Sequence, residues 1–200
     1  MKWNKIEENL EAQKLILFTS QEFRRSTGLS PASAKFLLIR YLKKGLILRI
    51  KRRRGLYCLK RKSPHPWLIA NKLLRPSYIS FETALSYYGG LPETIYGITS
   101  ATAKSTRTFE ALEKTFTYQK IKQAAFLGYQ PVSIEGSTVF LAEKEKALAD
   151  YLYFVHLKKK SLNDRLKWSE FDKKKTIHYL KTFDRKGLEE WAAHVIGKHN

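Results

Sequence analysis

The chain has 200 residues, 43% of them hydrophobic, and its 38 Lys and Arg against 18 Asp and Glu leave a formal net charge of +20. A chain of this length buries one large core or two smaller ones, and so high a charge favours an anionic partner. The single cysteine excludes an internal disulfide, and no apolar stretch approaches the ~18 residues of a membrane span. Because the first residues lead into a charged segment, we expect a soluble, non-secreted protein of the cytoplasm.

The basic residues are concentrated in one part of the chain. Residues 24–80 contain sixteen Lys and Arg and no Asp or Glu. Charge of a single sign over such a stretch indicates a local partner rich in phosphate.

The N-terminal segment predicts two helices separated by a short extended run. Apolar residues recur at helical spacing over residues 3–13, and residues 15–18 are a short apolar run. The sequence Thr-Ser-Gln-Glu at 19–22 is a capping box, in which the Thr hydroxyl and the Glu carboxylate satisfy the first free amides of a helix. A short helix is therefore expected to begin here.

A third helix is predicted directly after a tight turn. Gly28 can adopt the positive φ that such a turn requires, and Ser30 followed by Pro31 is an N-cap with proline at the first helical position. The helix is expected over residues 31–44, with Gly45 as its left-handed C-terminal residue. Its inward positions are expected to be Ala34, Leu38, Tyr41 and Leu42.

Two strand-like runs, residues 46–50 and 56–59, flank a basic loop and predict a β-hairpin with a basic tip. Helix, tight turn, helix and hairpin is the order of a winged helix-turn-helix, whose second helix enters the major groove of DNA. Guanidinium groups on the hairpin tip can pair bidentately with phosphate oxygens. The candidate DNA-binding residues are Ser30, Ser33, Lys35, Arg40, Lys43, Lys51, Arg52, Arg53 and Arg54.

Two other interpretations of this segment stay open. A short basic loop is in many proteins only a solvated turn. Winged helices also serve as protein-interaction modules, in which Phe36 and Ile39 would be exposed docking residues. The absence of acidic residues over residues 24–80 favours nucleic acid as the partner.

The composition changes at residues 63–66, Ser-Pro-His-Pro, which predicts a domain boundary. We expect an α+β chain, with a winged helix-turn-helix domain at residues 1–62 and a mixed α/β domain with C-terminal helices at 66–200. The second domain is expected to contain helices at 67–74, between Ser80 and Gly89, at 142–157 and after residues 169 and 184. Its strands are expected at 78–79, 95–102, 116–121, 125–129 and 137–141, with a hairpin turn at Glu135–Gly136.

Three segments resemble the AbiEi antitoxins of bacterial type IV toxin-antitoxin systems. They lie in the winged helix at residues 18–57, at residues 79–89, and at residues 141–150. The last segment, Leu-Ala-Glu-Lys-Glu-Lys-Ala-Leu-Ala-Asp, is similar to the family's Ala-x-x-Glu-Lys-Ala-Leu-x-Asp pattern and is the most specific. Tyr88 departs from the family, in which His is common at this position.

The resemblance implies a protein that binds inverted repeats of operator DNA, with possible cooperative pairing, and represses its own operon. It also implies that the C-terminal domain counteracts a co-encoded nucleotidyltransferase toxin, with or without direct contact. One alternative is a plain winged-helix regulator whose C-terminal domain senses a ligand or partner. Another is a winged-helix-fused nuclease. The operator sequence and the residues of antitoxin activity do not follow from these patterns.

We expect no catalytic, metal or cofactor site, and therefore no enzyme. The five histidines are far apart or in tail positions, without Cys at metal-ligand spacing. Glu143, Glu145 and Asp150 could be taken for a metal-binding cluster. In a helix, however, Glu145 and Asp150 point about 140° apart, so the three carboxylates are not expected to converge on one ion. Lys144 and Lys146 beside these acids predict solvated ion pairs.

The nuclease alternative depends on two Asp-x-Lys tripeptides, which begin at Asp172 and Asp184, since the chain has no Glu-x-Lys tripeptide. Both lie where helices are expected near the C-terminus, which disfavours a nuclease site.

A second basic surface is expected in the C-terminal domain, where it would extend the DNA footprint. Its candidate residues are Lys104, Arg107, Lys120 and Lys122. Tyrosines that stack on RNA bases are an alternative for this domain, although their surroundings favour core packing. These tyrosines are Tyr87, Tyr88, Tyr96 and Tyr129.

Overall fold

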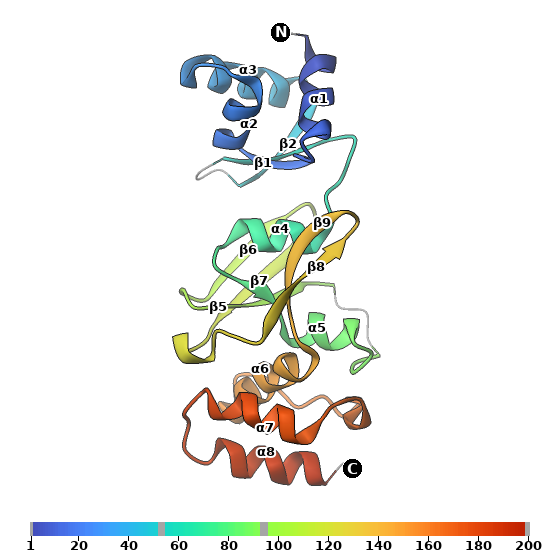
Figure 1. The fold of residues 1–200 in the computed structure, drawn as a ribbon, viewed down its shortest axis with the longest axis vertical. Coiled ribbons are helices and arrows are strands. Elements are labelled where there is room, and N and C mark those ends of the chain that lie inside the picture. Colours follow the sequence, from blue (N-terminus) through green and yellow to red (C-terminus); the bar gives the residue numbers. More distant parts are fainter. Residues whose placement is uncertain (1, 52–54, 93–95, 199–200) are drawn as a thin grey trace. The chain divides into compact units, whose positions relative to one another are not determined.

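The computed structural model describes residues 2–51, 55–92 and 96–198 (Figure 1). The chain divides into two compact units, Met1–Leu73 and Leu74–Asn200. Each unit has its own sheet, three-stranded in the first and six-stranded in the second. The chain is therefore an α+β protein, as expected.

The N-terminal unit is a winged helix-turn-helix. Its helices are α1 (Trp3–Ala12), α2 (Ser20–Thr27) and α3 (Pro31–Lys43). Its antiparallel sheet, in the order β1-β3-β2, is formed by β1 (Leu17–Thr19), β2 (Ile47–Lys51) and β3 (Leu56–Leu59). One core joins the helices to the sheet, and its buried members include Ile6, Leu10, Phe18, Phe23, Leu38, Tyr41 and Ile47.

Local signals in the sequence determine the ends of the two central helices. The capping box is confirmed, because Thr19 Oγ1 accepts from the Glu22 amide at 3.1 Å and Glu22 Oε2 accepts from the Thr19 amide at 2.6 Å. Gly28 ends α2 with φ of +66°. Ser30 Oγ then accepts from the Ser33 amide at 3.2 Å and caps α3.

The hairpin of β2 and β3 is confirmed, and a β-bulge between Arg49 and Lys51 interrupts its register. Gly55, at the start of the return strand, has φ of +51°, and its carbonyl accepts from the Ser20 amide at 3.1 Å. A Cβ atom at Gly55 would lie 2.2 Å from Ser20 Oγ. This position therefore requires glycine both for its backbone conformation and for its close contact with α2.

Helix α4 (Pro66–Leu73) falls within the N-terminal unit. Its Lys72 ammonium donates to the Leu17 carbonyl at 2.7 Å and pairs with Glu22 at 3.2 Å. Conversely, Lys51 of β2 donates from its Nζ to the carbonyl of Leu73 in α4 at 2.7 Å. The boundary between the two compact units therefore lies after α4, whereas the domain boundary predicted from the composition change at residues 63–66 lies before it. The roles of the two domains stay a prediction.

The C-terminal unit is built on a mixed sheet in the order β6-β7-β5-β4-β9-β8. Its strands are β4 (Tyr78–Ile79), β5 (Ile98–Thr102), β6 (Arg107–Ala111), β7 (Lys114–Lys120), β8 (Tyr129–Ile134) and β9 (Ser137–Ala142). The pairs β5–β7 and β4–β9 are parallel, and the other neighbours are antiparallel.

The helices of this unit are α5 (Phe81–Tyr87), α6 (Lys144–His156), α7 (Lys173–Lys181) and α8 (Leu188–Gly197), with short 3-10 turns at Gln123–Ala125 and Trp168–Glu170. Helix α6 packs against α5, α7 and α8. Within the unit, α6, α7 and α8 gather on one side of the sheet (Figure 1). The closing helices expected after residues 169 and 184 are therefore present.

The strand expected at 125–129 is wrong. A 3-10 turn ends at Ala125, and Gly128 takes φ of +71° before β8 begins at Tyr129. Strands β6 and β8 were not expected, because they are edge strands without a single buried side chain. Pro131 within β8 further weakens the sequence signal, since proline is confined to edge strands and bulges.

The solvated ion pair expected for Lys146 is also wrong. The side chains of Lys146 and Asp150 are both 0% exposed and pair with each other one helical turn apart in α6. Lys144, by contrast, pairs with Glu170 at 3.3 Å, and both side chains are partly exposed.

Candidate nucleic-acid interface

Helix α3 has one buried side and one exposed side. Ala34, Leu38 and Tyr41 face the core, as expected, whereas Leu42 is only partly buried. The exposed side chains are Pro31, Ala32, Ser33, Lys35, Phe36, Ile39, Arg40 and Lys43. The structure thus brings the α3 candidates for DNA binding to one outward side of one helix, and Ser30 is exposed at its N-terminus.

A groove of about 870 Å³ lies between α2, α3 and the β2–β3 hairpin. Three exposed cations line it, one from each element: Arg24, Lys35 and Arg49. The Arg49 guanidinium lies 5.8 Å from the centroid of the Tyr57 ring, which holds it by a cation–π contact. Arg49 also lines a neighbouring hollow of about 520 Å³ beside Lys43. The groove and the exposed side of α3 therefore form one basic surface, which we call the α3 surface.

Arg24 and Arg49 were not among the DNA-binding residues predicted from the sequence. Arg24 is in the last turn of α2, and its place in the groove depends on how α2 packs against α3. Arg49 is the outward residue in the burial pattern of β2. A charged residue inside an otherwise apolar run was visible in the sequence and could have identified Arg49.

Glu22, the acidic residue in the first turn of α2, is paired with other groups of the N-terminal unit. Burial raises the pKa of Glu22, but the hydrogen bond from the Thr19 amide and the Lys72 ammonium outweigh burial, so the pKa lies below the ordinary 4.5. The carboxylate is ionised and paired at neutral pH. It therefore detracts little from the positive potential of the α3 surface.

The hairpin candidates are only partly described. Arg52, Arg53 and Arg54 lie outside the described residues. Lys51 is half-buried and donates to the Leu73 carbonyl, so its ammonium is engaged within the N-terminal unit.

The four basic candidates of the C-terminal unit are all exposed. Lys104 follows the end of β5, Arg107 begins β6 and Lys120 ends β7, which places them at the same end of three neighbouring strands. Lys104 Nζ donates to the Arg75 carbonyl. Lys122 Nζ donates to the Asp184 carbonyl at 2.8 Å and lies 3.7 Å from its carboxylate.

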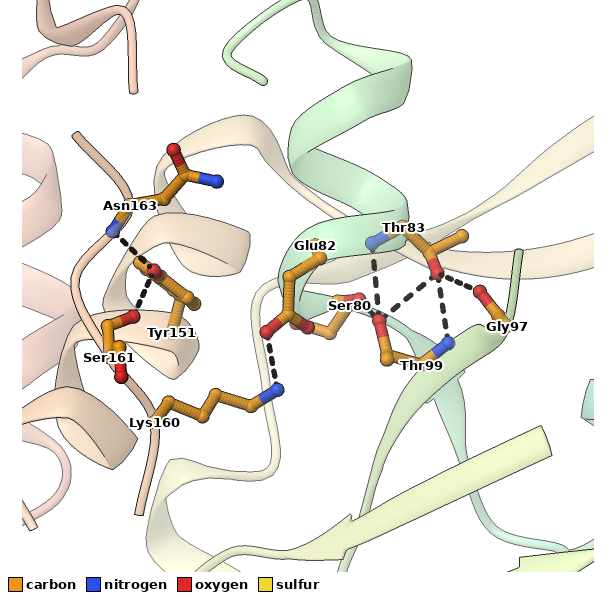
Figure 2. A network of polar contacts seen from close by, with 9 residues as sticks. All are labelled: Ser80, Glu82, Thr83, Gly97, Thr99, Tyr151, Lys160, Ser161 and Asn163. Carbon is orange, nitrogen blue, oxygen red and sulfur yellow. Dashed lines mark hydrogen bonds and ion pairs between the residues drawn. The ribbon is translucent and has the colours of Figure 1, made fainter. Parts of the chain in front are cut away.

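A polar network in the same unit links α5 to β5 (Figure 2). The Thr99 hydroxyl donates to the Ser80 carbonyl at 2.8 Å, while its amide donates to Thr83 Oγ1 at 2.8 Å. Next to these residues, Glu82 pairs with Lys160. The bonds of Ser80, Thr83 and Thr99 connect α5 to β5 and so support the fold of the unit. Among the residues that the structure describes, Glu82 Oε2 is buried without a hydrogen-bond partner.

A second cluster joins α6 to α7. The Lys175 ammonium lies 2.9 Å from the Glu143 carboxylate and 3.1 Å from that of Glu145, and the Tyr179 hydroxyl donates to Glu143 at 2.9 Å. Mainly through the hydrogen bond from Lys175, the pKa of Glu143 is lowered. Burial and the bond to Glu143 raise the pKa of Tyr179 to about 12. These shifts keep both groups in their usual protonation states at neutral pH, which suits an ion-pair bridge rather than acid–base catalysis.

Over residues 2–51, 55–92 and 96–198, no three His, Cys, Asp or Glu residues gather to hold a metal ion. Within the same described ranges, no helix is long and apolar enough to cross a membrane.

Residues 5–60 match a protein family described as "Transcriptional regulator, AbiEi antitoxin". This part of the N-terminal unit is therefore similar to the regulator domain of AbiEi antitoxins. The AbiEi match extends from α1 to the end of β3 and so contains α3 and all the cations of the groove. It supports a role in transcription regulation, with DNA as the partner. A comparison with curated proteins returned no match.

Proposed function

We propose that this AbiEi-family protein binds inverted repeats in the DNA upstream of its own operon and represses transcription. The observation that carries the proposal is the α3 surface, on which Arg40 and Lys43 are exposed beside the three cations of the groove. An α-helix fits the major groove of B-DNA, and flanking cations pair with the phosphates on either side.

The cations of the α3 surface have the role of positioning the helix. Lys35 and Arg24 line the groove with Arg49, while Arg40 and Lys43 lie in the last turn of α3. If six to ten phosphates are neutralised in the complex, affinity falls by about three to five orders of magnitude between 50 and 200 mM salt.

We assign the antitoxin activity, directed against a co-encoded nucleotidyltransferase, to the C-terminal unit. The support is the resemblance of residues 141–150 to the family pattern. In the structure this segment ends β9 and begins α6. Because Lys146 and Asp150 are buried, they support the fold of the unit, and contacts with the toxin fall to other residues.

The test of DNA binding is fluorescence anisotropy of the full-length protein on its own upstream DNA and on a scrambled duplex, titrated across salt. We expect the upstream DNA to bind about a thousandfold more tightly. Arg40→Ala with Lys43→Ala should weaken binding to both duplexes. The matched control is Lys2→Ala with Lys5→Ala, which removes two exposed charges from the α1 region of the same unit. Equal, weak binding to both duplexes would refute the autorepressor.

A plain regulator without antitoxin activity is the second candidate, and it shares the α3 surface. Growth rescue from the co-encoded toxin separates the two: rescue by the full chain supports the antitoxin, and failure of rescue with intact DNA binding supports the plain regulator.

The nuclease candidate has little structural support. Asp172 Oδ1 accepts from the Lys175 amide as the N-cap of α7. Asp184 lies beside Lys122. We therefore propose a protein without enzymatic activity.

A further inference from the structure

The centre of the exposed side of α3 is apolar. Phe36 is 65% exposed and Ile39 is 42% exposed, and exposed Ala32 lies one turn before Phe36. Residues three and four apart share a helix face, so these three side chains form one stripe along the first three turns. Exposure of the large apolar side chains of Phe36 and Ile39 to water is unfavourable for the free protein. We therefore expect the surface of a partner to cover them.

The charges around this stripe indicate what covers it. Lys35 lies on one side of the stripe and Arg40 on the other, and Lys43 continues it toward the end of the helix. Residues 24–80 contain no acid. A surface that is so uniformly positive is complementary to a polyanion. A single exposed helix fits the major groove of double-stranded DNA, so we take DNA to be that polyanion.

The residue types on α3 limit how it can read a base sequence. Direct readout by hydrogen bonds uses mainly Arg, Lys, Asn, Gln, Asp and Glu at base edges, and of these residues 31–39 contain Lys35 alone. Lys35 lines the groove with Arg24 and Arg49, a position suited to phosphate. Ser33 Oγ lies 3.0 Å from Ser30 Oγ, within the helix cap.

In the major groove, the apolar group that distinguishes one base from the others is the C5-methyl of thymine. We propose that Phe36 and Ile39 read thymine methyl groups and thereby provide much of the sequence preference of the α3 surface. This inference rests on the proposed DNA binding and adds to it the chemical feature that is recognised. The cations hold the helix in the groove, and the apolar stripe selects thymine-bearing steps.

The experiment compares the upstream duplex with the same duplex in which every thymine of the bound region is replaced by deoxyuridine. This change removes the methyl groups and leaves the base-pairing edges unchanged. The wild-type protein should bind the uracil duplex more weakly, by about fourfold for each buried methyl group. Phe36→Ala and Ile39→Ala should bind the thymine duplex more weakly and should reduce the ratio between the two duplexes toward one.

The control is Arg40→Ala, which should weaken binding to both duplexes by the same factor and keep the wild-type ratio. All three substitutions lie on an exposed surface, so folding is not at risk, and the ratio is independent of total affinity. Equal wild-type affinity for thymine and uracil duplexes overturns the methyl readout while operator binding stands. A ratio that persists in both Phe36→Ala and Ile39→Ala also overturns it.

Two further outcomes count against the proposal. If the wild-type protein fails to discriminate its upstream DNA from the scrambled duplex, the proposed function and the methyl readout fail together. If light scattering shows that the free protein is a dimer and that Phe36→Ala makes it a monomer, the apolar stripe is covered by a second copy of the chain, and the methyl readout is wrong.

Discussion

The Lys146–Asp150 pair places two opposite charges entirely out of water. Asp150 Oδ2 accepts from the Tyr78 hydroxyl at 3.0 Å and from the Ser80 hydroxyl at 2.6 Å, and its other oxygen faces Lys146 Nζ. The ammonium also lies 4.6 Å from the centroid of the Phe183 ring. Burial and the neighbouring Asp150 carboxylate hold the pKa of Tyr78 well above 10.0, so Tyr78 remains a donor. The pair is stable in the interior because each charge has these partners.

The first prediction removes one charge of this pair. Asp150→Asn keeps the shape of the side chain but leaves the Lys146 ammonium buried without its counter-charge, so we expect a loss of about 3–5 kcal/mol in the free energy of unfolding. Urea unfolding of the full-length protein measures the loss, and amide hydrogen exchange in α6 assigns it to the C-terminal unit.

The matched control for Asp150→Asn is Glu170→Gln, which removes the carboxylate of the partly exposed Lys144–Glu170 pair. Exposed pairs contribute less than about 1 kcal/mol. Equal losses for the two variants would mean that the buried pair is not the structural support described here.

The burial of Lys146 could not be predicted from its neighbours in sequence. A Lys four residues before an Asp is also the pattern of a surface ion pair on an exposed helix. What differs is tertiary: β4 contributes Tyr78 from the sheet, and Phe183 follows α7. Residue spacing predicted the helix α6 correctly, but only the packing of distant segments determines which of its sides meet water.

At the scale of elements, the position of the hairpin depends on Gly55, and this gives the second prediction. Gly28 and Gly55 both have positive φ, at +66° and +51°. A Cβ at Gly28 meets nothing within 4 Å, whereas one at Gly55 meets Ser20 Oγ at 2.2 Å. Gly28→Ala should therefore cost about 1–2 kcal/mol from its backbone alone. Gly55→Ala should cost a further 1–3 kcal/mol, roughly, from overpacking.

Amide hydrogen exchange in β1, β2 and β3 measures both losses within the N-terminal unit. Gly55→Ala should also reduce affinity for the upstream duplex, because Gly55 lines the groove of the α3 surface, while Gly28→Ala changes affinity less. If the two variants lose equal stability, the contact between Gly55 and Ser20 does not constrain the hairpin.

The elements of the N-terminal unit were predictable because their signals are local. The capping box, the turn at Gly28 and the Ser30–Pro31 start are each read within a few residues. The edge strands β6 and β8 had no such signal, since an edge strand with exposed side chains lacks the alternation that marks a half-buried one. Turns and caps were therefore better predictors here than apolar runs.

At the scale of the whole molecule, the candidate site was only partly visible in the sequence. The cations of α3 follow from helical spacing once the helix is recognised. The groove is different, because Arg24, Lys35 and Arg49 come from three elements and meet only when α2, α3 and the hairpin pack together. Helical spacing identified the face of α3, but the shape of the groove needed the fold.

The third prediction concerns the positive charge of the C-terminal unit. Lys104, Arg107 and Lys120 lie at one end of neighbouring strands, and Lys122 follows β7. We expect them to contact phosphates, which carry no base information. Changing all four to Ala should weaken binding to the upstream and scrambled duplexes by the same factor. It should also reduce the slope of log affinity against log salt by up to about 3.6, since each neutralised phosphate contributes about 0.9.

Anisotropy titrations at several salt concentrations measure this slope, and the ratio between the two duplexes should stay at its wild-type value. The control is Lys158→Ala with Lys159→Ala, Lys173→Ala and Lys174→Ala, which removes four charges elsewhere in the same unit. An unchanged slope for the variant of the four candidates would show that DNA binding is confined to the N-terminal unit. An equal reduction in both variants would instead mean that net charge, rather than a defined basic surface, increases affinity for DNA, because a general field attracts phosphate without regard to position.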